Sequence, residues 1–490
     1  MTKSPTIDLL FDQAFTLTAS PIYFLDDNGN EFLTFEAKGR KETLKIRSTP
    51  CKSMIRVFIM DNNLGNPKSH LVESIQEQML SKAYMSKATK TVFVRSGIAE
   101  NGDVIIDLEK NGYCRISPGR YQILESVDVP FWRPAKMRLL PLPEKISLID
   151  FEKLFRSKLN LVRDDNYLLL LAFIVKSLLV NRGDYPILVF QGDQGSAKTS
   201  NSNNLKKLID PTVPLSNSLP KDTNDLIVLA ISSLLLVFDN QSGLSGQKAD
   251  EFCRLSTGGG ISKRALYTDD SEKSYLLTRP VIFNGIDDLT VRPDFMERTI
   301  VIHLKTISEM NRKSQMFLEA EFDRDYGKLI GGIFELISKV LEILPDVNTP
   351  GLPRMTEYAR TGIAIERALN LRKGTFLSVY KENSNEKDES TFWNDEICNA
   401  IFNHLEGSST PLEGTMAQIK KTLTHQIRKA GVKLPETVKG FSGHLKRVSP
   451  TLKSKGIIVE KLGRSSSGTK YRIDYDGVTP FFQDEVINSL

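Results

Sequence analysis

Residues 186–200 read PILVFQGDQGSAKTS, a stretch that matches the phosphate-loop pattern at every position except one. The pattern G-x-x-x-x-G-K-[ST] has glycine directly before the lysine, whereas here Ala197 precedes Lys198. The compact apolar run 185–190 predicts a buried parallel strand, and residues 196–210 can continue as a helix. A loop between a strand and a helix is the context that phosphate binding requires, so the stretch predicts an α/β nucleotide-binding domain.

In such a loop the backbone N–H groups at the start of the helix face the phosphates. Gly192 and Gly195 are expected to supply the positive φ angles, and Ala197 is expected where the chain already turns helical and tolerates a methyl group. Lys198 is expected to contact the β- and γ-phosphates, and Thr199 to hold Mg²⁺. The predicted nucleotide-binding residues are Gly192, Asp193, Gln194, Gly195, Ser196, Ala197, Lys198, Thr199 and Ser200.

A second apolar run ends in an acid, as the other half of a nucleotide site requires. LLLVFDN spans residues 234–240, and Asp239 lies 41 residues after Lys198. This spacing predicts a Walker B strand that brings Asp239 to Mg²⁺ and its waters, and a core strand ending in a turn aspartate is the alternative. Asn240 stands where AAA+ ATPases commonly carry the glutamate that activates water, and an amide can orient water but cannot take its proton. The predicted metal ligands are therefore Thr199 and Asp239, and the predicted cofactors are ATP and Mg²⁺.

A third apolar strand, RPVIFNGI at 279–286, ends in Asn284, which is placed like the sensor-1 residue of AAA+ sites. There it would contact the γ-phosphate or the attacking water. Arg298 follows 14 residues later in RPDFMERTIVIHL, before another apolar run. In ring ATPases an arginine at this location reaches the neighbouring subunit's site and stabilises transition-state charge, and a surface salt bridge is the alternative.

The bulk properties bound the class of protein. The 490 residues, with a mass of 55.1 kDa, suffice for roughly three domains. The 40% hydrophobic and 26% charged residues are those of an ordinary soluble globular protein. The four cysteines form no C-x-x-C pair, so neither a disulfide framework nor a zinc site is predicted, and a reducing cytoplasm fits best. The N-terminus lacks a signal-peptide layout. The longest apolar run, 167–180, has 14 residues and predicts a buried helix rather than a membrane span.

Composition shifts predict where the domains begin and end. Short alternating runs separated by NG and PG turns predict a β-rich unit, and three prolines in RPAKMRLLPLPEK predict a linker. KENSNEKDES has no apolar residue and predicts a second linker. The expected parts are an N-terminal α+β region of unknown role (1–90), the β-rich unit (91–133), a linker (134–145), an AAA+ ATPase domain with a helical lid (146–380), a linker (381–392) and a winged-helix DNA-binding domain (393–490).

The C-terminal region carries a strong local charge. Residues 420–472 include fourteen Lys or Arg and two acids, an excess of +12 within a chain of net charge +5, which is typical of a surface that binds phosphates. Helical patterns around 416–429 and 438–455, followed by GIIVEKLGRSSSGTKYRIDY, predict a helix, a helix and a β-wing, and a merely solvated face is the alternative. The predicted duplex contacts are Lys439, Lys446, Arg447, Lys453 and Lys455, with Arg464 and Lys470 on the wing.

Taken together, the motifs FDN, CRLSTGGG, RALYTDD, RPVIFNGI and RPDFMER carry a specific resemblance. The chain resembles the AAA+ helicases and replication-initiator ATPases of bacterial phages, phage satellites and integrative elements, including the minichromosome-maintenance-like helicases of staphylococcal cassettes and pathogenicity islands. The resemblance extends more weakly through PRMTEYAR to the C-terminal unit and back to the β-rich segment. It does not cover residues 1–90.

The resemblance implies a hexameric ring with ATP at the subunit interfaces, Arg298 acting in trans and Arg354 of PRMTEYAR as a sensor-2 arginine from the helical lid. It also implies a hairpin, here about 261–278, that carries basic residues to single-stranded DNA in the pore. Lys263, Arg264 and Lys273 are the candidates on this hairpin. Its tip is acidic and would repel phosphates, so the flanking strands are expected to make the contact, and a solvated hairpin is the alternative.

These observations predict an ATP-dependent DNA helicase and replication initiator of a mobile genetic element. A DNA-bound ATP switch that melts or marks a site without translocating is the alternative, because the Walker B glutamate is missing. A packaging-type motor is disfavoured, since nothing resembles a nuclease or a portal-docking segment. The expected partners are DNA and further copies of the chain, without membrane or zinc.

Overall fold

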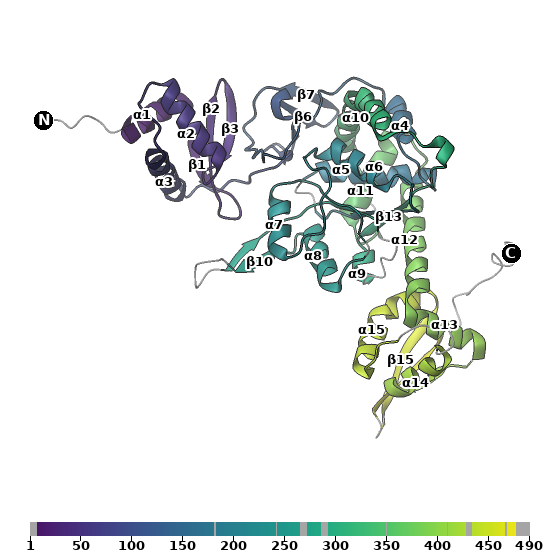
Figure 1. Ribbon diagram of the computed structural model, residues 1–490. Coiled ribbons are helices and arrows are strands. Elements are labelled where there is room, and N and C mark those ends of the chain that lie inside the picture. The colour runs from purple at the N-terminus through teal and green to yellow at the C-terminus, as the bar shows by residue number, and fades with distance from the viewer. Residues whose placement is uncertain are drawn as a thin grey trace. The chain divides into compact units, whose positions relative to one another are not determined.

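The computed structural model describes residues 7–180, 183–241, 243–264, 272–285, 293–348, 350–408, 410–427, 434–465 and 468–476. Internal contacts divide the chain into two compact units, whose helices and strands are labelled in Figure 1. The first unit comprises Met1–Gln241, Glu251–Gly285 and Ile302–Val379, and the second comprises Ser242–Asp250, Ile286–Val301 and Tyr380–Leu490. The second unit therefore combines the C-terminal region with the short segment that carries Arg298.

The N-terminal region packs three helices against an antiparallel sheet of order β1-β2-β3. Its elements are α1 (Ile7–Ala19), β1 (Ile22–Leu25), β2 (Glu31–Ala37), β3 (Arg40–Lys45), α2 (Thr49–Asp61) and α3 (Ser69–Ser86). The Ser48 side chain caps α2 by accepting a hydrogen bond from the Cys51 N–H at 3.2 Å. The core residues include Phe11, Phe15, Leu33, Ile55 and Ile75.

A four-stranded antiparallel sheet follows, with its strands in chain order. The strands are β4 (Ser96–Ile98), β5 (Val104–Asp107), β6 (Tyr113–Ser117) and β7 (Arg120–Leu124). Gly102 (φ 86°) and Gly119 (φ 76°) lie in the NG and PG turns at which the sequence predicts chain reversals. Glycine avoids the strain that other residues meet at such φ angles.

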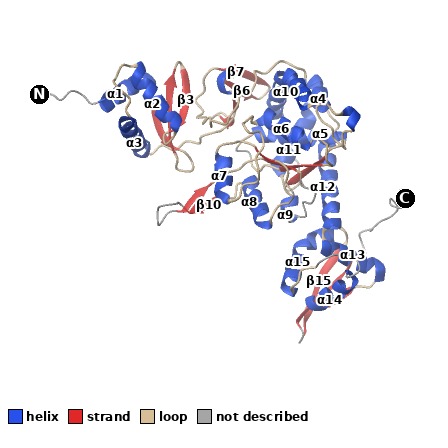
Figure 2. Cartoon of the chain, viewed as in Figure 1, coloured by secondary structure: helices blue, strands red, loops and turns tan. Residues whose placement is uncertain are grey.

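The expected nucleotide-binding region is built on a sheet of order β13-β8-β12-β9, whose strands are red in Figure 2. The strands are β8 (Ile187–Gln191), β9 (Leu236–Phe238), β12 (Val281–Asn284) and β13 (Thr299–His303). β12 pairs in parallel with both β8 and β9, so the carboxyl ends of these three strands lie at one edge of the sheet. Parallel sheets bind ligands outside this edge.

Helices precede, separate and follow these strands along the chain, and a two-stranded hairpin is inserted between α8 and β12. The helices are α4 (Leu148–Ser157), α5 (Tyr167–Leu178), α6 (Lys198–Ile209), α7 (Thr223–Ile231), α8 (Gly246–Thr257), α9 (Pro293–Met296), α10 (Gln315–Ile343) and α11 (Thr356–Ala368), and the hairpin strands are β10 (Ile261–Arg264) and β11 (Glu272–Tyr275). Every residue of α5 is buried, which confirms the helix predicted from the apolar run. No helix in the described ranges is long and apolar enough to cross a membrane.

The segment 381–392, which the composition predicts to be a linker, lies inside the continuous helix α12 (Thr375–Asn394). Asn383 and Lys387 are 2% and 4% exposed, although they are polar. Their side chains donate hydrogen bonds to backbone carbonyls of the segment that carries Arg298. The helix is therefore anchored by polar contacts that hydrophobic periodicity cannot reveal.

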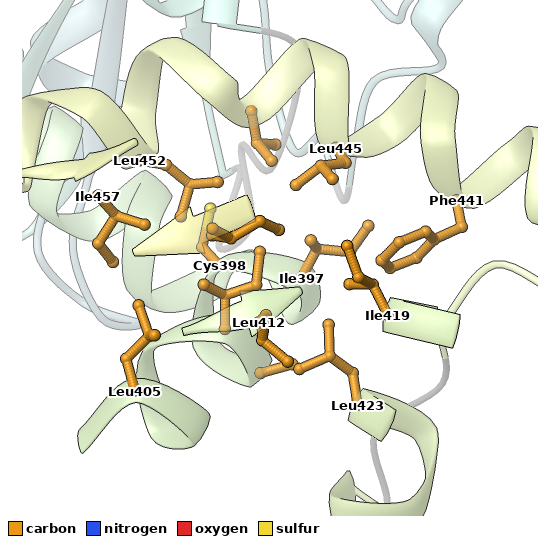
Figure 3. Packing of buried hydrophobic residues seen from close by; sticks show 14 of the residues in the cluster. Ile397, Cys398, Leu405, Leu412, Ile419, Leu423, Phe441, Leu445, Leu452 and Ile457 are labelled. Atoms are coloured by element: carbon orange, nitrogen blue, oxygen red, sulfur yellow. The ribbon is translucent and has the colours of Figure 1, made fainter. Parts of the chain in front are cut away.

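The C-terminal region follows the order helix, strand, helix, helix, strand, strand. Its elements are α13 (Glu396–Ser408), β14 (Leu412–Thr415), α14 (Met416–Ile427), α15 (Val438–Ser454), β15 (Ile457–Ser465) and β16 (Gly468–Tyr475). The three strands form an antiparallel sheet of order β14-β16-β15. Figure 3 shows the shared core, in which Leu445 and Leu452 of α15 lie above residues of α13, β14 and α14.

Candidate nucleotide-binding site

The phosphate loop joins β8 to α6, as the sequence predicts. Gly192 and Gly195 have φ angles of 149° and 85°, in agreement with the expectation for these glycines. Ala197 differs from its expectation. It is not yet helical but left-handed, with φ 61° and ψ 33°, and it is the N-cap residue of α6. The methyl group at this position is therefore held in a conformation that disfavours side chains.

We expect the Ala197→Gly variant to be modestly more stable than the natural chain. A left-handed conformation costs a residue with a side chain roughly 1–2 kcal/mol, while the added flexibility of glycine in the unfolded chain takes back about 0.4–1 kcal/mol. Urea unfolding followed by tryptophan fluorescence should show a net gain of roughly 0.5–1 kcal/mol, with ATP hydrolysis retained. Gly195→Ala is the opposite control, because its methyl would lie 2.9 Å from Arg312 Nη2. A loss of stability in Ala197→Gly would contradict the left-handed assignment.

The two predicted magnesium ligands lie together. Thr199 lies at the start of α6, and Asp239 directly follows β9. The Oγ1 atom of Thr199 donates a hydrogen bond to Oδ1 of Asp239 over 3.1 Å. Hydroxyl and carboxylate oxygens are the hard ligands that Mg²⁺ takes, together with waters and substrate phosphates. Lys198 Nζ donates to the carbonyls of Gly192 and Asp193 within its own loop. The residues present therefore fit a bound Mg²⁺–nucleotide.

Asn284 is almost fully buried, at 1% exposure. Its side chain forms hydrogen bonds both to the segment that follows β9 and to α6. Its Oδ1 accepts from the Asn240 N–H over 2.9 Å, and its Nδ2 donates to Ser202 Oγ over 2.9 Å. The same Asn240 N–H lies 2.8 Å from Asp239 Oδ1. Asn240 takes a left-handed φ of 54°, which asparagine tolerates better than most residues. Asn284 thus fixes the backbone around Asp239, and its amide oxygen and amide nitrogen each make one hydrogen bond within the site.

A buried ionic cluster holds the last turn of α6 against the residues that directly precede β9. Asp210 Oδ2 accepts hydrogen bonds from Lys206 Nζ at 2.9 Å and from the Leu234 N–H at 2.8 Å, and Arg95 Nε lies 3.4 Å from Asp210 Oδ1. Burial acts to raise the pKa of Asp210, but the adjacent Lys206 and Arg95 outweigh it and lower this pKa. The carboxylate therefore stays charged and fixes α6 relative to the strand that ends in Asp239.

The sequence-based interpretation missed a segment that crosses the phosphate loop after β13. The Ile307 N–H donates to the Gly195 carbonyl over 3.2 Å, and Thr306 Oγ1 donates to Asp193 Oδ2 over 3.1 Å. On the other side, Asn160 Nδ2 donates to the Ser196 carbonyl over 2.8 Å. No motif marks these residues, because they support the loop only through the fold.

Arg312 belongs to the same crossing segment. A methyl group added at Gly195 would lie 2.9 Å from Nη2 of Arg312 and 3.6 Å from its Cζ, so the guanidinium rests against the phosphate loop. Arg312 is exposed. Among the described residues, the structure gives its side chain no hydrogen bond or ion pair. The exposed guanidinium of Arg312 therefore lies beside the phosphate loop, where it is accessible to a phosphate group.

Arg298 and Arg354, the two arginines predicted to complete the nucleotide site, lie in different units of the chain. Arg298 lies between α9 and β13 in the second unit, and its Nη1 donates to the Asp294 carbonyl. Its Nε is buried and has no hydrogen-bond partner among the residues that the structure describes. Arg354 lies three residues before Glu357, whose side chain is against Gly183, near the amino end of β8.

The residues predicted to contact DNA lie in two regions of the chain, the β10–β11 hairpin and the C-terminal region. On the hairpin, Lys263 pairs in register with Lys273 across β10 and β11, while the side chains of Lys263, Arg264 and Lys273 and the tip at 265–271 lie outside what the structure describes. In the C-terminal region, Lys455 is half-buried and lies 3.8 Å from Glu389. The exposed basic residues there are Lys439, Lys446, Arg447, Lys453, Arg464 and Lys470.

Comparisons with known proteins place two segments of the chain. Residues 152–386 match the family model of the actinomycete integrative conjugative element replication protein, and residues 397–479 match the model of the AICE RepA C-terminal domain. These matches assign the two segments to the replication proteins of integrative conjugative elements. No curated protein matches the chain.

Solved structures with similarity to the chain include two of the NrS-1 C-terminal region. The apo structure is 11% identical, with a TM-score of 0.40 and coverage of 96% of this chain and 100% of that one. The A form apo structure is 10% identical, with a TM-score of 0.39 and the same coverage. The X-ray structure of JCV helicase is 16% identical, with a TM-score of 0.21 and coverage of 49% and 72%. Such low TM-scores do not establish a common fold.

Proposed function

We propose that the protein is an ATP-dependent DNA helicase and replication initiator of a mobile genetic element, built on an AAA+ core. The observation that carries the proposal is the contact between Thr199 Oγ1 and Asp239 Oδ1, which brings the two halves of a Mg²⁺–ATP site together at the carboxyl edge of a parallel sheet. The match of residues 152–386 to a replication-protein family supports the same function.

At this site the backbone N–H groups at the start of α6 and Lys198 would bind the nucleotide's phosphates. Thr199 and Asp239 would hold Mg²⁺, which stabilises charge on the transferring phosphoryl group when bound. Arg312 would add a second cation from the same chain, because its guanidinium rests against Gly195. Asn240 and Asn284 would hold the attacking water in position without removing its proton.

Oligomerisation is part of the proposal. The ATP site of one chain has Lys198 and Arg312 but lacks a glutamate after Asp239, so its chemistry depends on added electrostatic stabilisation. Arg298 of a neighbouring copy would supply this charge in a hexameric ring. A DNA-bound switch remains the second candidate, and the observation that favours it is Asn240 in place of the water-activating glutamate.

The direct test of the nucleotide site is steady-state ATP hydrolysis by the full chain, with and without Mg²⁺ and with and without DNA. The proposal expects hydrolysis that needs Mg²⁺ and that single-stranded DNA stimulates. Magnesium-independent or DNA-independent hydrolysis would contradict it.

The C-terminal region is proposed to be a winged helix that binds duplex DNA. Its element order and its three-stranded antiparallel sheet support the assignment, with α15 as the recognition helix and the β15–β16 hairpin as the wing. The match of residues 397–479 to the C-terminal domain of a replication protein also supports it. Lys446, Arg447 and Lys453 are exposed on or beside α15, where they can reach phosphates.

We expect the triple substitution of Lys446, Arg447 and Lys453 by Gln to weaken duplex binding and to flatten its salt dependence. Each lost phosphate contact lowers the log–log slope by about one, so the slope should fall by about three. Fluorescence anisotropy across a salt series measures both quantities. A matched control replaces Lys110, Lys328 and Lys373, which are equally exposed in the first unit, by Gln. Equal slopes of log affinity against log salt concentration in the two variants would show that α15 is not the duplex-binding site.

A further inference from the structure

The segment that carries Arg298 lies between β12 and β13, and it belongs, together with the first residues of β13, to the same compact unit as the C-terminal region. Ile286–Val301 and Tyr380–Leu490 belong to one compact unit. The element that joins them is α12, which contacts the Arg298 segment and is separated from α13 by a single residue, Asp395. Contacts with the C-terminal region therefore contribute to the position of Arg298.

Two buried polar side chains of α12 make this connection. Asn383 pairs with both backbone groups of Val301, accepting from its N–H over 3.3 Å and donating to its carbonyl. Lys387 Nζ donates to the Met296 carbonyl over 2.9 Å and to the Thr299 carbonyl over 2.5 Å. These acceptors lie on both sides of Arg298, so α12 holds the backbone of the turn that presents the arginine.

A buried ammonium group at this place is costly. Burial lowers the pKa of Lys387 to about 8, and Asp388 and Glu297 only partly oppose this effect. An apolar residue would pack in the same helix without that cost. In exchange, the carbonyls of Met296 and Thr299 gain a hydrogen-bond donor that reaches across from the helix to the turn. The lysine therefore fixes geometry at the expense of stability.

The other end of α12 belongs to the core of the C-terminal region. Phe392 is fully buried in the cluster of apolar residues that forms the core of the C-terminal region, and Trp393 packs against this cluster. Phe441, Leu445 and Leu452 place α15 in the same core. In addition, α9 packs against α15. A shift of α15 on DNA would consequently reach the Arg298 turn through one packed unit.

We propose that Asn383 and Lys387 are positioning residues that let DNA bound by the C-terminal region control the presentation of Arg298 to a neighbouring copy's nucleotide. This inference rests on the proposed role of Arg298. It makes α12 a mechanical link between duplex binding and ATP turnover, and it assigns a function to a stretch whose composition resembles a linker.

The test uses the full chain with Lys387→Met, which keeps the length of the side chain but removes its donors. ATP affinity should stay unchanged, whereas DNA-stimulated kcat should fall by about 10²-fold, the usual effect of a misplacement near 1 Å. Lys387→Arg keeps the donors and should retain most of the stimulation. Lys381→Met, exposed on the same helix, is the matched control and should behave like the natural chain.

Subunit mixing separates positioning from general damage. Lys387→Met subunits have an intact phosphate loop, so mixing them with Lys198→Ala subunits, which keep a well-placed Arg298, should restore turnover. Mixing Lys387→Met subunits with Arg298→Ala subunits should restore no turnover, because neither kind of subunit presents a well-placed Arg298 to its neighbour. If Lys387→Met fails to fold, Asn383→Leu takes its place in the same mixtures.

Two outcomes are distinct. Full DNA-stimulated turnover in Lys387→Met, or complementation of Arg298→Ala by Lys387→Met, would overturn the link through α12. Full turnover in Arg298→Ala itself would instead overturn the proposed role of Arg298 and leave the hydrogen bonds of α12 as purely structural.

Discussion

Replacing Lys198 by Ala should reduce ATP hydrolysis by about 10²–10³-fold or more, because it removes the cation that contacts the phosphates as charge develops in the transition state. The ammonium lies in the loop already, where it donates to the carbonyls of Gly192 and Asp193. Phosphate release measured under saturating ATP and DNA gives the result directly.

The matched control for this change is Lys221→Ala, which removes an exposed lysine from the same unit. Its hydrolysis rate should equal that of the natural chain. Hydrolysis at the natural rate in Lys198→Ala would show that the loop at 192–199 is not the catalytic phosphate site, whatever its likeness to the pattern.

Replacing Arg298 by Ala should leave nucleotide binding in place and lower turnover by about 10³–10⁵-fold, the range found when an arginine finger is removed. The arginine stands outside the sheet's own unit, and its buried Nε has no hydrogen-bond partner among the described residues. Equilibrium binding of a fluorescent ATP analogue and single-turnover hydrolysis separate the two effects.

Mixed assemblies test whether Arg298 acts in trans. Arg298→Ala and Lys198→Ala subunits are each inactive, yet a mixed ring contains interfaces with an intact loop on one side and an intact arginine on the other. Some activity should return on mixing. Arg372→Ala, which removes an exposed arginine from the first unit, is the control. Turnover at the full rate by an isolated monomer would contradict a shared site.

The sequence predicted the parts of the site that depend on local chemistry. The phosphate loop, the acid after β9 and the polar residue that ends β12 follow from apolar runs of fixed length with a specific residue at their ends. Asp239 and Asn284 lie at one edge of the sheet because β9 and β12 are parallel neighbours. Thr199 lies at the same edge because β8, which pairs in parallel with β12, leads into the phosphate loop and α6. The apolar run of α5 and the NG and PG turns were predictable for the same reason.

The remaining features depend on contacts between distant segments. Arg312 reaches Gly195 across more than a hundred residues, and no spacing rule connects them. The run 381–390 was interpreted as part of a linker because it contains no apolar residue, whereas two of its polar residues, Asn383 and Lys387, are buried and bond to backbone carbonyls. The left-handed angle at Ala197 was not expected, because alanine gives no signal for it. The family resemblance to replication proteins agrees with the matched segments 152–386 and 397–479.

The most direct test of the central claim is ATP-driven separation of a forked DNA duplex by the full chain. We expect strands to separate only with Mg²⁺ and hydrolysable ATP, and not in the Lys198→Ala or Arg298→Ala variants. A protein that hydrolyses ATP in response to DNA but never separates the strands would contradict the helicase function and establish the ATP switch in its place.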